Sequence, residues 1–221
     1  LDLPALAAIA AARGVTVATD NTWSGCWFLQ PLQLGANISI QAATKYLAGH
    51  ADVMQGVVVT DSPTLTAKIA SAYEALGLTI GADDAYLALR GIRTLPVRLA
   101  QHQRNATAVA GWLETVPQVA RVFYPALPSD PGHALWKRDF SGASGLVSLA
   151  LAEGLDASSA ELFVDSLQYF GIGASWGGYE SLVQIASPDR LREHSVWTGT
   201  QPVVRLHVGL EDKDDLIADL Q

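Results

Sequence analysis

The chain has a single cysteine, few basic residues and no long apolar run. Cys26 stands alone among 221 residues, so an intrachain disulfide and a thiolate metal cluster are excluded, as suits a reducing cytosol. With 14 Lys and Arg against 22 Asp and Glu, the net charge of -8 argues against a nucleic-acid or anionic-membrane surface. No apolar stretch reaches the roughly 18 residues of a membrane span, and no basic start precedes an apolar signal core. We expect a cytoplasmic protein that binds neither nucleic acid nor membrane and holds no metal.

The chain does contain enough apolar side chains for a sizeable core. Its hydrophobic content of 49% over 221 residues suits one large domain or two small ones. The first residue is Leu and the chain opens inside a helical pattern, so we expect that an N-terminal part of the protein precedes it. We find no internal repeat and no low-complexity segment.

In the first part of the chain, helical and strand patterns alternate. Apolar spacing of three and four predicts a helix over residues 1–12, and Ser62-Pro63 has the cap and first-turn residues of a helix that runs to about Leu76. β-branched or alternating runs predict strands over 14–19, 37–41 and 56–60. Such alternation implies an α/β unit with mostly parallel strands.

The pattern from 83 to 116 predicts one long helix, bent at Gly91 and Pro96, that bridges two domains. We therefore predict a domain boundary there, with an α/β domain over 1–92 and a smaller α+β domain over 93–221. The second part should hold an antiparallel sheet with helices on one face. Its predicted strands are 119–124, 145–151, 182–186 and 203–208, its helices 133–137, 156–167 and from 211 onward, with a glycine-rich loop over 171–178.

Three charged residues lie in or next to predicted strands, where a charged side chain needs a partner or a ligand. Lys45 follows the strand of residues 37–41, and an ammonium at a strand end is either in a structural ion pair or held for Schiff-base chemistry. Asp20 ends a strand, where α/β sheets place ligand contacts, although an aspartate also suits a turn or helix cap. Arg205 lies inside a strand and needs either an acidic partner or a ligand.

Four motifs together resemble the Cys/Met-metabolism family of pyridoxal-phosphate enzymes. These are DNTW (20–23), SIQAATKYLAGHAD (39–52), SWGGYESL (175–182) and VRLHVGLED (204–212), and the likeness extends through WKRDFSGASGLVS (136–148). The resemblance covers essentially the whole chain and is strongest to the bacterial cystathionine β-lyase branch. It implies the aminotransferase-like fold (fold type I) and pyridoxal 5'-phosphate as cofactor.

The resemblance also assigns cofactor contacts. Lys45 matches the lysine that carries the cofactor as a Schiff base and later takes the Cα proton of the substrate. Asp20 matches the aspartate that keeps the pyridine nitrogen protonated. Thr44 matches a phosphate-contacting hydroxyl, and Ala42 stands where many relatives have a second one.

Further motif positions concern the substrate and the loops. Arg205 matches the arginine that binds the substrate α-carboxylate, because a planar bidentate donor suits that group. Ser175 and Trp176 match the segment that helps to clamp the same carboxylate. We expect the remaining motif side chains to be structural: His50, Asp52, Tyr179 and Glu180.

The implied activity is β-elimination of an amino-acid substrate, cystathionine, giving homocysteine, pyruvate and ammonia. The alternatives are a γ-synthase, a γ-lyase or a methionine γ-lyase of the same family, or a non-catalytic fragment or partner subunit. Trp176 and Tyr179 favour the β-lyase branch. The resemblance also implies a homo-oligomer, dimer or tetramer, with shared active sites. The family's phosphate loop, the tyrosine stacked on the cofactor ring and the residues lent by a neighbouring subunit would precede Leu1.

Overall fold

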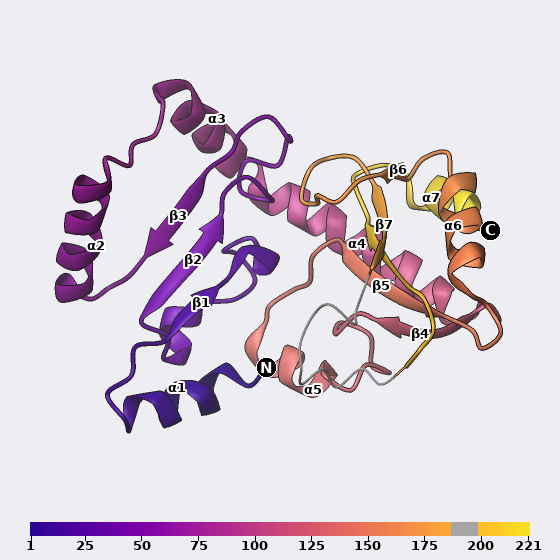
Figure 1. Ribbon diagram of the computed structural model, residues 1–221, viewed down its shortest axis with the longest axis horizontal. Helices are drawn as coiled ribbons and strands as arrows, with labels where there is room; N and C mark the ends of the chain where they lie inside the picture. Colours follow the sequence, from indigo (N-terminus) through magenta and orange to yellow (C-terminus); the bar gives the residue numbers. More distant parts are fainter. Residues whose placement is uncertain (187–198) are drawn as a thin grey trace.

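The computed structural model describes residues 1–186 and 199–221 of the chain, and it contains two sheets joined by helices (Figure 1). The first sheet has the strand order β1-β2-β3, and the second has the order β4-β5-β8-β7-β6. The first sheet and its surroundings comprise α1 (Leu3–Ala11), β1 (Ala18–Asp20), η1 (Thr22–Ser24), η2 (Pro31–Leu34), β2 (Ile38–Ala42), β3 (Gly56–Val59), α2 (Pro63–Leu76) and α3 (Ala82–Ile92). The remainder comprises α4 (Leu95–Leu113), β4 (Val119–Phe123), α5 (His133–Asp139), β5 (Leu146–Leu151), α6 (Ala157–Ser166), β6 (Gly171–Ile172), β7 (Leu182–Ala186), β8 (Val203–His207) and α7 (Lys213–Asp219).

The first sheet is only partly parallel. Strands β1 and β2 pair in parallel, as the alternation predicted, whereas β2 and β3 pair antiparallel, so the prediction was wrong for β3. A parallel partner requires a crossover, usually a helix, but the chain between β2 and β3 folds back on itself. The Thr44 N–H donates to the Gln55 carbonyl at 3.1 Å, and this hydrogen bond joins the two ends of the connecting segment.

Strand β1 begins later than predicted. Residues 14–17 were expected to extend it, but Val17 N–H donates to the side chain of Asn37 at 2.8 Å. The Val17 carbonyl accepts from the backbone of Asn37 and Ile38. The ladder therefore starts at Ala18, and Asp20 remains at the carboxyl end of the strand.

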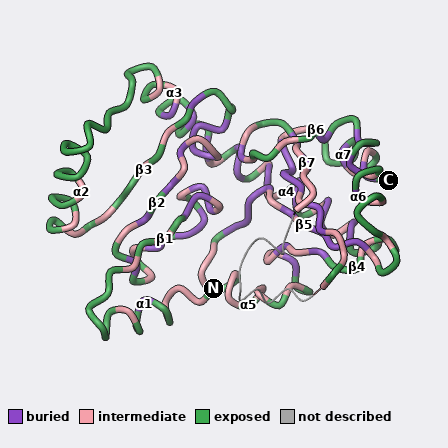
Figure 2. The backbone as a smooth tube through the Cα atoms, viewed as in Figure 1, coloured by how far each residue is buried: buried purple, intermediate pink, exposed green. Residues whose placement is uncertain are grey.

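Helix α2 has the predicted ends. Ser62 Oγ accepts from Leu65 N–H, Pro63 occupies the first turn, and Gly77 ends the helix at a φ of 63°. None of its residues is buried, and its tube is mostly green in Figure 2. No helix within residues 1–186 and 199–221 is long and apolar enough to cross a membrane.

The single bent helix predicted over 83–116 is two helices. Helix α3 ends at Ile92 and α4 begins at Leu95, with Pro96 in the first turn of α4. A proline has no N–H to donate, and the first turn is the place in a helix where that donor is not needed. The break falls at the predicted domain boundary between residues 92 and 93, and the division into two domains stays a prediction.

The second sheet has the predicted antiparallel character. All its described pairings are antiparallel except β6 with β7, and β6 lies within the stretch predicted to be a loop. Helices α4, α6 and α7 share one core cluster with alternate residues of β5 and β8, which confirms helices on one face of the sheet. Members of this cluster include Val109, Leu113, Val147, Leu149, Ala160, Val164, Leu206 and Leu216.

Candidate active site

The amine of Lys45 meets the loop before β7. Strand β2 ends at Ala42, whose carbonyl accepts from Lys45 N–H at 3.0 Å and so turns the chain. The Lys45 Nζ then lies 2.8 Å from Ser175 Oγ and 5.3 Å from the centre of the Trp176 ring. Lys45 is thus brought together with two predicted site residues, Ser175 and Trp176, that lie about 130 residues away in the sequence.

The surroundings of Lys45 favour its neutral form. The side chain is partly buried, and this burial lowers its pKa below the usual 10.5, with a smaller effect of the same sign from the positive charge of Arg205. Among the described residues no carboxylate forms an ion pair with Lys45. The structural ion pair considered from the sequence is therefore not found there, and the arrangement suits a lysine that acts as an amine.

Arg205 holds the same loop from β8. Its Nη2 donates to the Ala174 carbonyl at 2.7 Å and is 3.4 Å from the Ser175 carbonyl. Its Nε is buried without a hydrogen-bond partner in the described part of the chain. A buried guanidinium N–H without an acceptor is costly, and a ligand carboxylate is the acceptor that would satisfy it best.

Asp20 lies beside the segment that leads to Lys45. Its Oδ1 accepts from Thr22 N–H at 2.9 Å, while Thr22 Oγ1 accepts from Ala42 N–H at 2.8 Å. The loop after β1 is thus tied to the end of β2, three residues before the lysine. The structure gives Asp20 the predicted turn interaction and places its carboxylate, which is exposed, at the same edge of the sheet as Lys45.

Thr44 has a different local partner from the one predicted. Its hydroxyl accepts from Gln55 N–H at 2.9 Å and donates to the Gln55 carbonyl at 3.2 Å. A hydroxyl has one proton, so a phosphate contact would require it to release that carbonyl. The phosphate contact stays a prediction.

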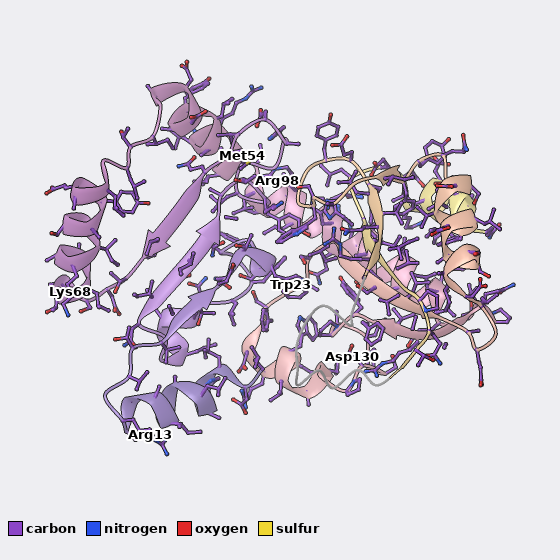
Figure 3. The ribbon with its side chains drawn as sticks, viewed as in Figure 1. Arg13, Trp23, Met54, Lys68, Arg98 and Asp130 are labelled. Atoms are coloured by element: carbon purple, nitrogen blue, oxygen red, sulfur yellow. The ribbon has the colours of Figure 1, made fainter. Side chains whose placement is uncertain are left out.

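Arg98 is a buried residue of the site that our reading of the sequence missed. Its guanidinium donates to the carbonyls of Tyr46 (2.7 Å) and Gly91 (2.8 Å), and Nε donates to Thr94 Oγ1 (3.0 Å). Figure 3 shows Arg98 near the start of α4. The signal was present: Arg98 stands three residues after the buried Leu95, on the face of α4 that packs inward.

Two histidines and two aromatic rings pack behind Lys45. The Tyr46 ring is 5.2 Å from His102, 5.9 Å from His207 and 5.5 Å from Trp176. Burial lowers the pKa of His102 to about 4 and that of His207 to about 3, so both imidazoles are neutral near pH 7. Burial also raises the pKa of Tyr46, whose hydroxyl accepts from Gly145 N–H at 2.9 Å.

Comparison with known proteins identifies the family. The model of the Cys/Met metabolism PLP-dependent enzymes, where PLP is pyridoxal phosphate, matches residues 1–221. The chain belongs to this family. Over the full chain it is 50% identical to a cystathionine beta-lyase of Bordetella avium, and over 99% of the chain it is 44% identical to cystathionine beta-lyase MetC of Escherichia coli (strain K12). It covers 55% and 56% of these proteins, so it spans about half the length of the curated relatives it matches.

The fold also matches that of a solved structure. A cystathionine gamma-lyase from Lactobacillus plantarum, solved with L-serine, superposes with a TM-score of 0.89 at 33% identity, covering 99% of this chain and 58% of that one. The predicted aminotransferase-like, fold type I architecture is thereby confirmed.

The residues present fit the cofactor of the family. A Schiff base requires a lysine amine that is partly neutral, and the burial of Lys45 favours that form. A protonated ring nitrogen requires a carboxylate, and Asp20 supplies one at the same sheet edge. The unsatisfied Nε of Arg205 is a donor for an anionic group of the substrate.

Proposed function

We propose that the full-length protein is a PLP-dependent carbon-sulfur lyase that performs β-elimination on cystathionine, giving homocysteine, pyruvate and ammonia. The observation that carries this proposal is the Lys45 amine, 2.8 Å from Ser175 Oγ and beside the guanidinium that holds the same loop. The choice of substrate is supported by the relatives of 50% and 44% identity, which are named cystathionine beta-lyases.

Bound PLP would supply an electron-withdrawing ring that stabilises negative charge at the substrate Cα. Lys45 would hold the cofactor and, once displaced, would take the Cα proton on its Nζ; burial and the charge of Arg205 lower the pKa of that amine, which favours this role. Ser175 Oγ would orient the amine by accepting its hydrogen bond.

The other predicted residues would position the two ligands. Arg205 would bind the α-carboxylate with donors that the Ala174 carbonyl does not use, Nε among them. Trp176 would exclude water from one side of Lys45. Asp20 would pair with the ring nitrogen, and Thr44 would contact the phosphate after turning from Gln55.

The products of cystathionine cleavage test the proposal. We expect the purified full-length protein to release pyruvate and homocysteine in equal amounts, because β-elimination breaks the bond between sulfur and the three-carbon half of the substrate. Chromatography of the keto acids and thiols measures both. Release of 2-oxobutyrate with cysteine would instead assign the γ-elimination named for the Lactobacillus plantarum relative. No keto acid at all would favour a non-catalytic partner subunit.

We also propose that the protein acts in the cytoplasm as a homo-oligomer, dimer or tetramer, with active sites shared between subunits. Its support is the resemblance of the motifs around Lys45 and Arg205 to enzymes whose sites are completed by a neighbouring subunit. Light scattering on the purified full-length protein should give at least twice the mass of one chain. A monomer mass with full lyase activity would contradict shared sites.

A further inference from the structure

Two side chains on one face of β8 hold the loop that contacts Lys45. Arg205 and His207 are two residues apart in the strand, so their side chains point to the same face. Arg205 Nη2 donates to the Ala174 carbonyl, and His207 Nε2 lies 3.1 Å from the Gly177 N–H. The first contact fixes the start of the loop, and the second fixes its end.

The end of the loop that His207 holds rests directly on the backbone of the lysine. Gly177 has a φ of +87°, and a Cβ added there would lie 2.8 Å from Tyr46 N and 2.9 Å from the Lys45 carbonyl carbon. Such a close approach leaves no room for any side chain. A shift of Gly177 would therefore displace either the lysine segment or Ser175, which accepts the hydrogen bond of the Lys45 amine.

The hydrogen-bond partners of the two histidines bear on their tautomers. Gly177 N–H can only donate, so its 3.1 Å contact with His207 Nε2 is a hydrogen bond in the tautomer with the proton on Nδ1, which is the one we assign. In the other tautomer Nε2 would instead donate to the Gly178 carbonyl, which lies 3.2 Å away. His102 Nδ1 is 2.9 Å from the Val208 carbonyl and so carries its proton.

Each ring has a second nitrogen without a described partner. These are Nδ1 of His207 and Nε2 of His102, both buried, in rings whose centres are 5.2 Å apart. Leaving these two nitrogens unpaired is costly, and an apolar ring at either position would avoid that cost. A phenyl ring at position 207, however, could not accept the hydrogen bond of Gly177 N–H. We therefore infer that a histidine is present at this position for the sake of that hydrogen bond.

We propose that His207 is a positioning residue for Lys45: by accepting from Gly177 N–H it fixes the loop of residues 174–178, which in turn fixes the Lys45 amine. This inference rests on the proposed function at one point only, namely that the Lys45 amine takes part in the reaction. His102 belongs to the same buried cluster but makes no described contact with the loop, so it offers a matched control.

The test compares His207→Phe, which keeps a ring without an acceptor, with His207→Gln, whose amide oxygen can replace Nε2. His102→Asn is the control, since its amide can replace the Nδ1 donor. In the full-length protein, hydrogen exchange of Gly177 N–H should become about tenfold faster in His207→Phe. It should stay near the wild-type rate in His207→Gln and His102→Asn.

The second readout is the amine itself, in the same proteins freed of cofactor. The pH midpoint for acylation of Lys45 should lie below the usual lysine value of 10.5 in the wild type. In His207→Phe it should rise toward that value, and His207→Gln should restore it. In the active enzyme we expect kcat to fall roughly 10 to 100-fold in His207→Phe. KM should change less.

An unchanged Lys45 midpoint in His207→Phe would overturn the proposal, as would the same midpoint shift in His207→Phe and His207→Gln. His207→Leu, closer in volume to histidine, provides the same comparison if the phenylalanine variant does not fold. Because exchange and acylation do not depend on turnover, a wild type that releases no keto acid would refute the proposed function and still leave these readouts to decide the role of His207.

Discussion

Replacing Lys45 by alanine should lower keto-acid release from cystathionine by about 10³-fold or more, because the proposed base for the Cα proton is removed. The covalent attachment of the cofactor would be lost as well, since Lys45 is the only lysine among the predicted site residues. The measurement is kcat/KM for keto-acid release by the full-length protein, together with the visible absorption of the bound cofactor.

Two further variants test whether the loss comes from the missing base, from the missing positive charge or from the loss of any lysine. Lys45→Arg keeps a cation beside Ser175 but cannot take a proton at neutral pH, so we expect the same loss as in the alanine variant. Lys68→Ala removes a lysine on α2, at the far side of the first sheet in Figure 3, and should leave the rate unchanged. Normal pyruvate release by Lys45→Ala would refute the proposed role of the amine.

Lys45 could be singled out from the sequence because its signal is local. A strand ends at Ala42, and a lysine follows after small residues and a hydroxyl, which is a pattern contained in one short stretch. Helix α2 was predicted for the same reason, since Ser62 and Pro63 mark its start within one short stretch.

The residues that hold Lys45 in place could not be found in this way. Arg98 bonds to Tyr46, 52 residues away, and His207 bonds to Gly177, 30 residues away. Periodicity indicates that a side chain is buried, but it does not say which carbonyl or N–H it will meet. The antiparallel pairing of β3 was missed for a similar reason. The chain turns back between β2 and β3 through the contact between Thr44 and Gln55, and no strand pattern in the sequence indicates that contact.

Replacing Gly91 by alanine should cost about 1 to 3 kcal/mol of unfolding free energy, because the new methyl group would meet backbone. A Cβ at Gly91 would lie 2.4 Å from the Ala48 carbonyl oxygen and 2.5 Å from that of Leu47. Neither atom belongs to a flexible side chain, so α3 and the turn after Lys45 would have to separate. Chemical denaturation of the full-length protein measures the loss.

Gly111→Ala is the matched control, since Gly111 also lies in a helix, α4, and an added Cβ there would meet no atom of residues 1–186 or 199–221 within 4 Å. That change should stabilise the protein by about 0.5 to 1 kcal/mol, because alanine loses less backbone entropy in a helix than glycine does. Equal stability of the Gly91 variant and the wild type would contradict the close contact.

The effect of Gly91→Ala should also reach the lysine. Arg98 Nη2 donates to the Gly91 carbonyl at 2.8 Å, and Nη1 of the same guanidinium donates to the Tyr46 carbonyl at 2.7 Å, one residue after Lys45. Separating α3 from this turn would stretch one of the two bonds and leave part of a buried cation without an acceptor, which is costly. We therefore expect the Gly91 variant to lose activity at temperatures where it is still folded, whereas Gly111→Ala should keep the wild-type rate.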